Sequence, residues 1–146
     1  MPNEPKVAIV TGASQGIGAC LVKTFLERGY SVVAASRDMT KSGAFISSAK
    51  LALLDGDIGQ IDTAAKIVET ATSKFRSIDA LVNNAGIFFT KPFTAYTGED
   101  FRALASTNLE GFLYITQLAI KQLMAQKSGG RLTSRHSRSS RSPGSI

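Results

Sequence analysis

Three glycines with a fixed spacing, Gly12, Gly16 and Gly18, are the residues of this chain whose pattern most clearly suggests chemistry. They follow an apolar run at residues 7–10 and precede an amphipathic stretch at residues 19–28. A strand, a glycine-rich turn and a helix in this order direct backbone N–H groups and a helix N-terminus at a phosphate. Gly12 would permit the tight turn, Gly16 the close approach of a pyrophosphate, and Gly18 the close packing of the helix on its strand.

The spacing of these glycines excludes one class of protein and leaves a simpler interpretation open. Ile17 rather than lysine follows Gly16, so the P-loop of nucleoside triphosphatases is not expected. The spacing also differs from G-x-G-x-x-G, and on its own it could mark an ordinary turn. A second pattern favours the functional interpretation, because an apolar run at residues 78–82 leads directly into Asn83-Asn84-Ala85-Gly86.

Alternating apolar and amphipathic stretches predict the scaffold that positions both patterns. Strands are expected at residues 6–10, 31–35, 50–54 and 78–82, and helices at 16–28, around 41–47, at 61–75 and, as one long or two short helices, at 99–126. The strands are apolar on both faces, which is typical of a parallel sheet covered by helices on each side. The predicted fold class is therefore α/β with a doubly wound parallel sheet. The aromatic-rich segment at residues 87–98 is either a loop packed on the core or a wall of a substrate cleft.

Together the two motifs resemble those of the short-chain dehydrogenase/reductase family, in which T-G-x-x-x-G-I-G opens the nucleotide-binding domain and N-N-A-G follows the fourth strand. The resemblance covers residues 5–131 and implies a partial Rossmann-like domain over residues 1–131 with strand order 3-2-1-4. It also implies a nicotinamide cofactor, with an Asp-hydrophobic pair beside the adenine ring. The cofactor-binding residues that it implies are Gly12, Ser14, Gln15, Gly16, Ile17, Gly18, Ser36, Arg37, Asp57, Ile58, Asn84, Ala85 and Gly86.

The end of the second predicted strand bears on the choice of nucleotide. An acidic residue there would bind the ribose 2′-hydroxyl of NAD, whereas this chain has Ser36 and Arg37. Arginine presents planar donors that match a phosphate, so we expect NADP rather than NAD as cofactor. Arg37 could instead be a solvated surface charge, and the neutral Gln15 stands where many NADP-preferring relatives carry a base.

The catalytic set that the resemblance implies is incomplete in this sequence. Asn108 matches the family's catalytic asparagine. Residues Tyr30, Tyr96 and Tyr114 are followed four positions later by alanine, aspartate and leucine, so no Y-x-x-x-K is present. We therefore expect this chain to derive from an NADP-dependent oxidoreductase of carbonyl or alcohol compounds and to bind cofactor without turnover. A nucleotide-binding module with no catalytic role is the alternative.

The last residues do not continue the family pattern. Residues 132–146 are rich in arginine and serine and lack apolar alternation, so we expect an irregular tail rather than a central strand. His136, the only histidine, lies in this tail, and we predict no metal site. The abrupt change after Arg131 suggests truncation or a shift of reading frame. A genuine tail that binds RNA or an acidic partner is the alternative.

Composition places the chain among ordinary globular domains. Its 146 residues are 43% hydrophobic and carry a net charge of +6, but four of the arginines lie at or beyond Arg131, and the remaining 13 basic and 11 acidic residues nearly balance. A nucleic-acid partner is therefore not expected. The single cysteine, Cys20, and the lack of a long apolar stretch favour a cytoplasmic protein without a membrane span. By resemblance, full-length relatives are homo-oligomers that act on small molecules, and this half alone should be marginally stable with an exposed fourth strand.

Overall fold

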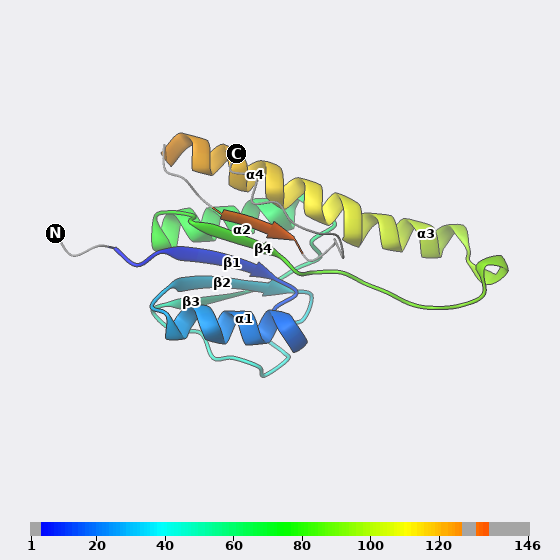
Figure 1. Ribbon diagram of the computed structural model, residues 1–146, viewed down its shortest axis with the longest axis horizontal. Helices are drawn as coiled ribbons and strands as arrows, with labels where there is room; N and C mark the ends of the chain where they lie inside the picture. Colours follow the sequence, from blue (N-terminus) through cyan, green and yellow to red (C-terminus); the bar gives the residue numbers. More distant parts are fainter. Residues whose placement is uncertain (1–3, 127–130, 135–146) are drawn as a thin grey trace.

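The computed structural model describes residues 4–126 and 131–134, and these form one parallel sheet with helices on both faces (Figure 1). The strand order is β3-β2-β1-β4-β5, so the predicted order 3-2-1-4 is confirmed and a fifth strand extends it. The strands are β1 (Val7–Thr11), β2 (Ser31–Ser36), β3 (Leu51–Asp55), β4 (Ala80–Asn83) and β5 (Arg131–Ser134). The helices are α1 (Gly16–Glu27), α2 (Ile61–Phe75), α3 (Gly98–Ala105) and α4 (Gly111–Gln126), with short turns η1 (Phe93–Ala95) and η2 (Ser106–Glu110).

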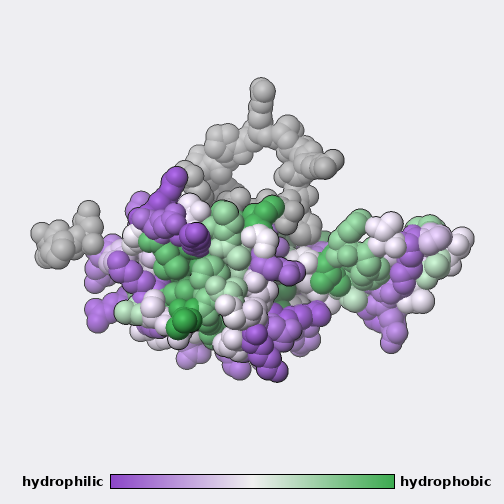
Figure 2. Space-filling model, turned by 90° about the horizontal axis from the view of Figure 1, so that it is seen from below, coloured by the Kyte–Doolittle hydropathy of each residue, from purple (hydrophilic) through white to green (hydrophobic). Residues whose placement is uncertain are grey.

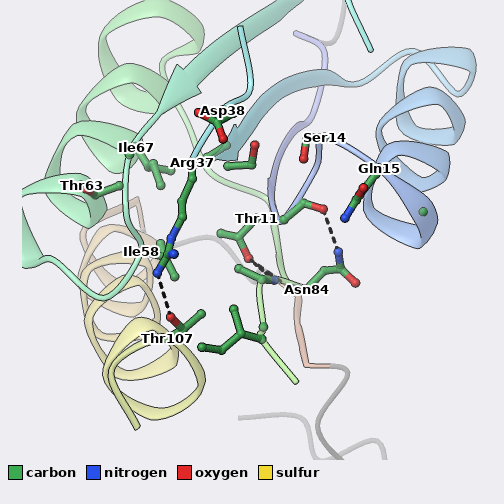
Figure 3. A pocket seen from close by; sticks show the side chains of 18 of the residues that line it. Thr11, Ser14, Gln15, Arg37, Asp38, Ile58, Thr63, Ile67, Asn84 and Thr107 are labelled. Atoms are coloured by element: carbon green, nitrogen blue, oxygen red, sulfur yellow. Dashed lines mark hydrogen bonds between the residues drawn. The ribbon is translucent and has the colours of Figure 1, made fainter. Parts of the chain in front are cut away.

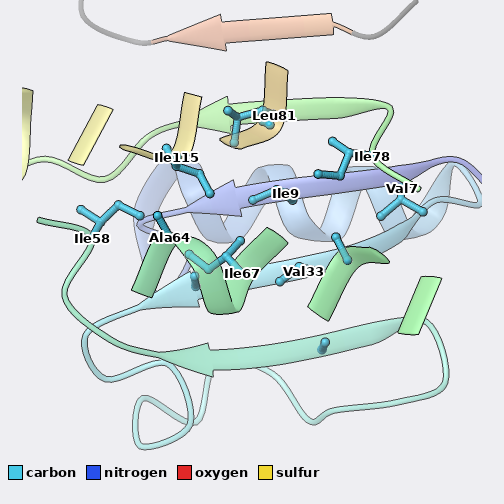
Figure 4. Packing of buried hydrophobic residues seen from close by; sticks show 13 residues of the cluster. Val7, Ile9, Val33, Ile58, Ala64, Ile67, Ile78, Leu81 and Ile115 are labelled. Atoms are coloured by element: carbon cyan, nitrogen blue, oxygen red, sulfur yellow. The ribbon is translucent and has the colours of Figure 1, made fainter. Parts of the chain in front are cut away.

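Two apolar clusters hold the layers together, one on each face of the sheet. Alternate residues of β1 pack in one cluster or the other, because successive side chains of a strand point to opposite faces. Ile9 packs in the cluster with Ile67 of α2 and Ile115 of α4 (Figure 4), whereas Val10 packs in the cluster with Val22 of α1. All five of these side chains are fully buried, so the central strand positions helices on both sides.

The long C-terminal helix is continuous but changes pitch at η2. Residues Ser106–Glu110 form a π-helical turn between α3 and α4. Gly111 follows this turn, and a Cβ there would lie 2.7 Å from Ile58 Cγ2, so only glycine allows the helix to pass so close. π-Turns inside α-helices are frequent at functional sites.

A side-chain amide fixes the far end of α4 to the start of β4. Gln126 Nε2 donates to the Ile78 carbonyl at 2.9 Å, and Ile78 N–H donates to Gln126 Oε1 at 2.8 Å. The glutamine thus pairs with Ile78 as a neighbouring strand residue would. This end of the helix is therefore held in register with the sheet.

Two predictions about local structure are wrong. Residues 131–134 form β5 in parallel register with β4, although the sequence there lacks apolar alternation. An edge strand needs backbone partners on one side only, and β4 supplies them whatever the side chains are. Consequently β4 is not the exposed edge that we expected. The rest of the predicted arginine/serine tail, with His136, lies outside the described residues.

The second error is the helix expected around residues 41–47, where the structure has turns followed by irregular chain. Gly43 has φ +68°, which no α-helix accommodates. Thr40 donates its backbone N–H to Asp55 at 2.8 Å and its hydroxyl to the same carboxylate, and these bonds fix the turn to the end of β3. The side-chain and backbone bonds from Thr40 also hold the pKa of Asp55 below its ordinary value.

A lobe built from η1, α3 and the segment before them extends away from the sheet (Figure 1). Figure 2 shows hydrophobic side chains on this lobe, and three phenylalanines, Phe88, Phe93 and Phe101, are 87%, 91% and 69% exposed. Neither interpretation of residues 87–98 describes the whole segment. Ile87 lines the cleft described below, whereas Phe88 and Phe93 are exposed to solvent and do not pack on the core. Among the described helices, none is long and apolar enough to cross a membrane.

Candidate functional site

A cleft of about 560 Å³ opens where the carboxyl ends of β1, β2 and β4 meet the N-terminus of α1 (Figure 3). This is the position at which open parallel sheets bind ligands. It is lined by Thr11, Gly12, Ser14, Gln15, Gly16, Ile17, Ala35, Ser36, Arg37, Asp38, Gly56, Ile58, Thr63, Ile67, Asn84, Ala85, Gly86, Ile87 and Thr107. The structure therefore brings most of the predicted cofactor-binding residues together, while Gly18, Asp57 and Asn108 lie outside this lining.

The turn between β1 and α1 requires glycine at two positions for different reasons. Gly12 has φ +63°, and a Cβ there would lie 2.8 Å from Ala85 Cα, so both its conformation and the adjacent backbone exclude a side chain. Gly16 has φ +58°, but among the described residues nothing lies within 4 Å of its missing Cβ. Gly16 lines the cleft, and without a side chain its backbone is accessible to a ligand.

Gly18 has a packing role that differs in detail from the prediction. A Cβ on Gly18 would collide with the Gly12 carbonyl oxygen and would lie 2.6 Å from Asn84 Nδ2. The residue therefore packs the first turn of α1 against the glycine turn and the loop after β4, rather than against the face of a strand. Its effect on the cleft is indirect, through the position of its neighbours.

The N-terminus of α1 is open to an anion. In the described part of the chain, no side chain caps this helix at Gln15, and its first turn contains no acidic residue. The contrast within the same protein is α3, where the Thr97 hydroxyl and the Asp100 carboxylate form a reciprocal capping box. The free N–H groups at the start of a helix carry partial positive charge, so the start of α1 offers donors to a negatively charged ligand.

Thr11 joins the two halves of the cleft and was missed as a site residue, although it is the first letter of the glycine motif. Its hydroxyl oxygen accepts from the backbone N–H groups of Asn84 at 3.1 Å and Ala85 at 3.0 Å. Asn84 Nδ2 in turn donates to the Gly12 carbonyl at 3.0 Å. These bonds fix the loop after β4 to the glycine turn (Figure 3).

Two polar atoms at the cleft are buried and find no hydrogen-bond partner among the described residues. They are Ser36 Oγ, at the end of β2, and Asn84 Oδ1. A buried polar group without a partner is costly, and such groups are rare in folded proteins. Both residues line the cleft, so a ligand bound there could supply the missing partners.

Arg37 crosses one side of the cleft, opposite Ser14 and Gln15 (Figure 3). Its Nη2 donates to Thr107 Oγ1 at 3.3 Å and lies 3.6 Å from Asp57 Oδ2. Thr107 was missed by sequence reasoning because it is 70 positions away from Arg37 in the chain. Arg37 therefore lines the cleft with two specific partners, although its side chain remains 59% exposed.

Asn108 lies in η2 and holds the far wall of the cleft. Its Oδ1 accepts from Ile87 N–H and its Nδ2 donates to the Ile87 carbonyl, both at 3.0 Å. Both hydrogen-bonding ends of the amide are thus engaged with backbone. Among the described residues, no group of three or more His, Cys, Asp or Glu side chains is placed to hold a metal ion.

A model of the family described as short chain dehydrogenase matches residues 6–144. The chain belongs to the short-chain dehydrogenase family. A curated relative, the galactitol 2-dehydrogenase of Agrobacterium fabrum, is 33% identical over 141 residues, which cover 93% of this chain and 54% of the relative. Senescence-associated protein 13 of Arabidopsis thaliana is 34% identical over 128 residues, which cover 84% and 48%. The chain therefore spans about half the length of the curated relatives that it matches.

Solved structures of short-chain dehydrogenases agree with the fold. The 3-ketoacyl-(acyl-carrier-protein) reductase of Brucella melitensis, solved in complex with NADH, is 29% identical with a TM-score of 0.81, over 90% of this chain and 57% of that one. The ligand-free aldohexose dehydrogenase of Thermoplasma acidophilum is 28% identical with a TM-score of 0.78, over 90% and 49%.

The short-chain dehydrogenase motifs predicted the two walls of the cleft but not what joins them. The glycine turn and the loop after β4 were both visible as residue patterns. The contacts of Thr11, Thr107 and Ile87 depend on how distant segments pack, and so does the place of Thr63 and Ile67 of α2 in the cleft lining. The T-G-x-x-x-G-I-G motif held a signal for Thr11, because this threonine is its first residue.

Proposed function

We propose that this chain binds a nicotinamide dinucleotide in the cleft, NADP(H) in preference to NAD(H), as the cofactor-binding part of an oxidoreductase that acts on carbonyl or alcohol compounds. The observation that carries the proposal is the uncapped N-terminus of α1, which opens onto the cleft behind a glycine turn. Helix N-termini of this kind bind phosphate through backbone N–H groups and the helix dipole.

The residues at the cleft fit a dinucleotide. Ser14, Gln15, Gly16 and Ile17 line the cleft at the start of α1 and would hold the pyrophosphate, with Gly12 and Gly18 shaping the turn. The unpartnered Ser36 Oγ at the end of β2 is a hydroxyl suited to the adenosine ribose or its phosphate.

The remaining cleft residues would complete the site. We assign Ile58, which is buried at the edge of the cleft, and its neighbour Asp57 to the adenine end. Asn84, Ala85 and Gly86 form the wall after β4, and the free Asn84 Oδ1 is an acceptor on that wall.

The preference for NADP(H) rests on Arg37. Its guanidinium group is the cation nearest to Ser36 in the chain, and it lines the cleft at the end of β2. A guanidinium group can donate two parallel hydrogen bonds to a phosphate, and the adenosine ribose of NAD carries no 2′-phosphate to accept them. Asp38 also lines the cleft, and its negative charge would oppose binding of a 2′-phosphate. It lies one position after Arg37, whereas Arg37 directly follows Ser36.

The chemistry that we propose is hydride transfer, which the nicotinamide ring supplies when it is bound. Asn108 would act as a positioning residue, because its amide is engaged with Ile87 and holds the wall of the cleft. None of the tyrosines in the 146 residues has a lysine four positions later. We therefore expect the chain by itself to bind cofactor and to leave carbonyl substrates unreacted.

Fluorescence titration with NADPH and NADH tests the proposal directly. The wild-type chain should bind NADPH more tightly than NADH, and Arg37→Ala should remove most of that difference while it leaves NADH binding nearly unchanged. Lys41→Ala, a neighbouring cation that does not line the cleft, serves as the matched charge control. A folded sample that binds neither coenzyme at millimolar concentration would refute the proposal, and turnover of a carbonyl substrate would refute its catalytic part.

A further inference from the structure

We propose that Asp57 and Thr107 withhold the Arg37 guanidinium and thereby limit how strongly the cleft prefers a nucleotide that carries a 2′-phosphate. The inference rests on the proposed function, since it concerns selectivity at the same cleft. It assigns to two further residues a part in that selectivity, one on the loop after β3 and one on the π-turn η2.

Both partners engage the same nitrogen of Arg37. Nη2 donates to Thr107 Oγ1 at 3.3 Å and lies 3.6 Å from Asp57 Oδ2. Figure 3 shows the side chain extended from the end of β2 along the cleft to Thr107. In this position the guanidinium group spans part of the space that a nucleotide would occupy, instead of standing free beside Ser36.

The two partners are more firmly fixed than the arginine. Thr107 is only 6% exposed, and it belongs to a continuous helix. Asp57 is anchored through its other oxygen, because Gly59 N–H donates to Oδ1 at 2.9 Å. The Arg37 side chain is 59% exposed, so it is the member of the set that can move when a ligand arrives.

A 2′-phosphate must therefore compete for a cation that already has a counter-ion. The dianion can form two charge-assisted hydrogen bonds with the guanidinium group, so it wins the competition, but its gain is reduced by the contacts that Arg37 gives up. A nucleotide without the 2′-phosphate does not draw Arg37 from Asp57 and Thr107, so these contacts do not reduce its affinity. The ion pair joins two side chains that are 59% and 38% exposed, and exposed ion pairs are weak, so the reduction should be about two- to fivefold in affinity.

The ratio of affinities for two small probes isolates this effect. Isothermal titration of the whole chain with adenosine 2′,5′-bisphosphate and with adenosine 5′-monophosphate gives a ratio in which any contact to the adenine ring cancels. Asp57→Asn keeps an oxygen acceptor for Gly59 but removes the charge, and it should raise the ratio about two- to fivefold. Thr107→Val keeps the volume but removes the acceptor, and it should raise the ratio about twofold.

The Arg37→Ala background provides the decisive control, because Asp57→Asn should then leave the ratio unchanged. A ratio that rises equally in that background would show a general charge effect and would overturn the inference. So would an unchanged ratio in both single variants, or a lower one, which would mean that the partners present Arg37 to the phosphate. If the bisphosphate binds as expected but NADPH binds no tighter, only the proposed function fails; if neither probe binds, both proposals fail.

Discussion

Replacing Gly12 with alanine should destabilise the protein clearly more than the same change at Gly29. Both glycines have left-handed backbone, with φ +63° and +85°, so each substitution costs about 1–2 kcal/mol in backbone strain. At Gly12 the new Cβ would also lie 2.8 Å from Ala85 Cα and 2.9 Å from Ala85 N. These are backbone atoms that cannot rotate away, and overpacking of this kind adds about 1–3 kcal/mol. The expected losses are therefore about 2–5 kcal/mol at Gly12 and about 1–2 kcal/mol at Gly29.

Urea denaturation followed by far-UV circular dichroism measures the difference. With a slope of about 1–3 kcal/mol/M, the midpoint for Gly12→Ala should lie about 1 M below that for Gly29→Ala. The Gly29 variant is the matched control, since among the described residues nothing lies within 4 Å of its added Cβ. Equal midpoints would refute the reasoning, because the close approach of the glycine turn to the loop after β4 would then have no energetic consequence. A Gly12 variant that fails to fold while the Gly29 variant folds would support it.

Four further outcomes are expected. Gly16→Ala should cost only about 1–2 kcal/mol of stability by urea denaturation but weaken NADPH binding at least about tenfold by titration, because a methyl group on this cleft-lining residue would keep a phosphate from the backbone; an unchanged affinity would contradict this. Asn108→Ala should lower the free energy of unfolding by about 1–3 kcal/mol, since it unpairs both backbone groups of Ile87, and an unchanged free energy of unfolding would contradict this. The side-chain bond from Lys91 lowers the pKa of Asp100 below 3.8. The stability that the ionised Asp100 contributes is therefore complete above pH 3.8 and is lost as the pH falls through the lowered pKa. The free energies of unfolding of wild type and Asp100→Asn, measured against pH, should converge in that acid range, and parallel curves would contradict this. The chain alone should melt broadly or aggregate in light scattering, because apolar side chains of α4 are exposed, and a sharp monomeric melt would be the contrary result.

The sequence could predict the parts of this fold that depend on local pattern. Residues 61–75 have the helical period and a clear start and end, and α2 spans Ile61–Phe75 as predicted. The glycine turn was predictable for the same reason, because the left-handed backbone at Gly12 and Gly16 favours glycine. Local chemistry and tertiary structure agree at these positions.

The parts that could not be predicted depend on packing between distant segments. β5 forms because the edge of β4 offers backbone partners, and side-chain alternation does not report this. The helix expected at residues 41–47 is replaced by turns that Asp55 fixes from the neighbouring strand. The pairing of Arg37 with Thr107 likewise joins residues whose proximity follows only from the crossing of the long helix over the sheet.

Two side-chain amides, those of Asn108 and Gln126, bind the backbone on the two sides of β4. Asn108 binds Ile87, four residues after the end of the strand, and Gln126 binds Ile78, two residues before its start, and each uses both ends of its amide. The segment that contains β4 is thus held at two points on the continuous helix formed by η2 and α4. We expect a shift of this helix to move Ile87, which lines the cleft, and so to change the width of the cleft.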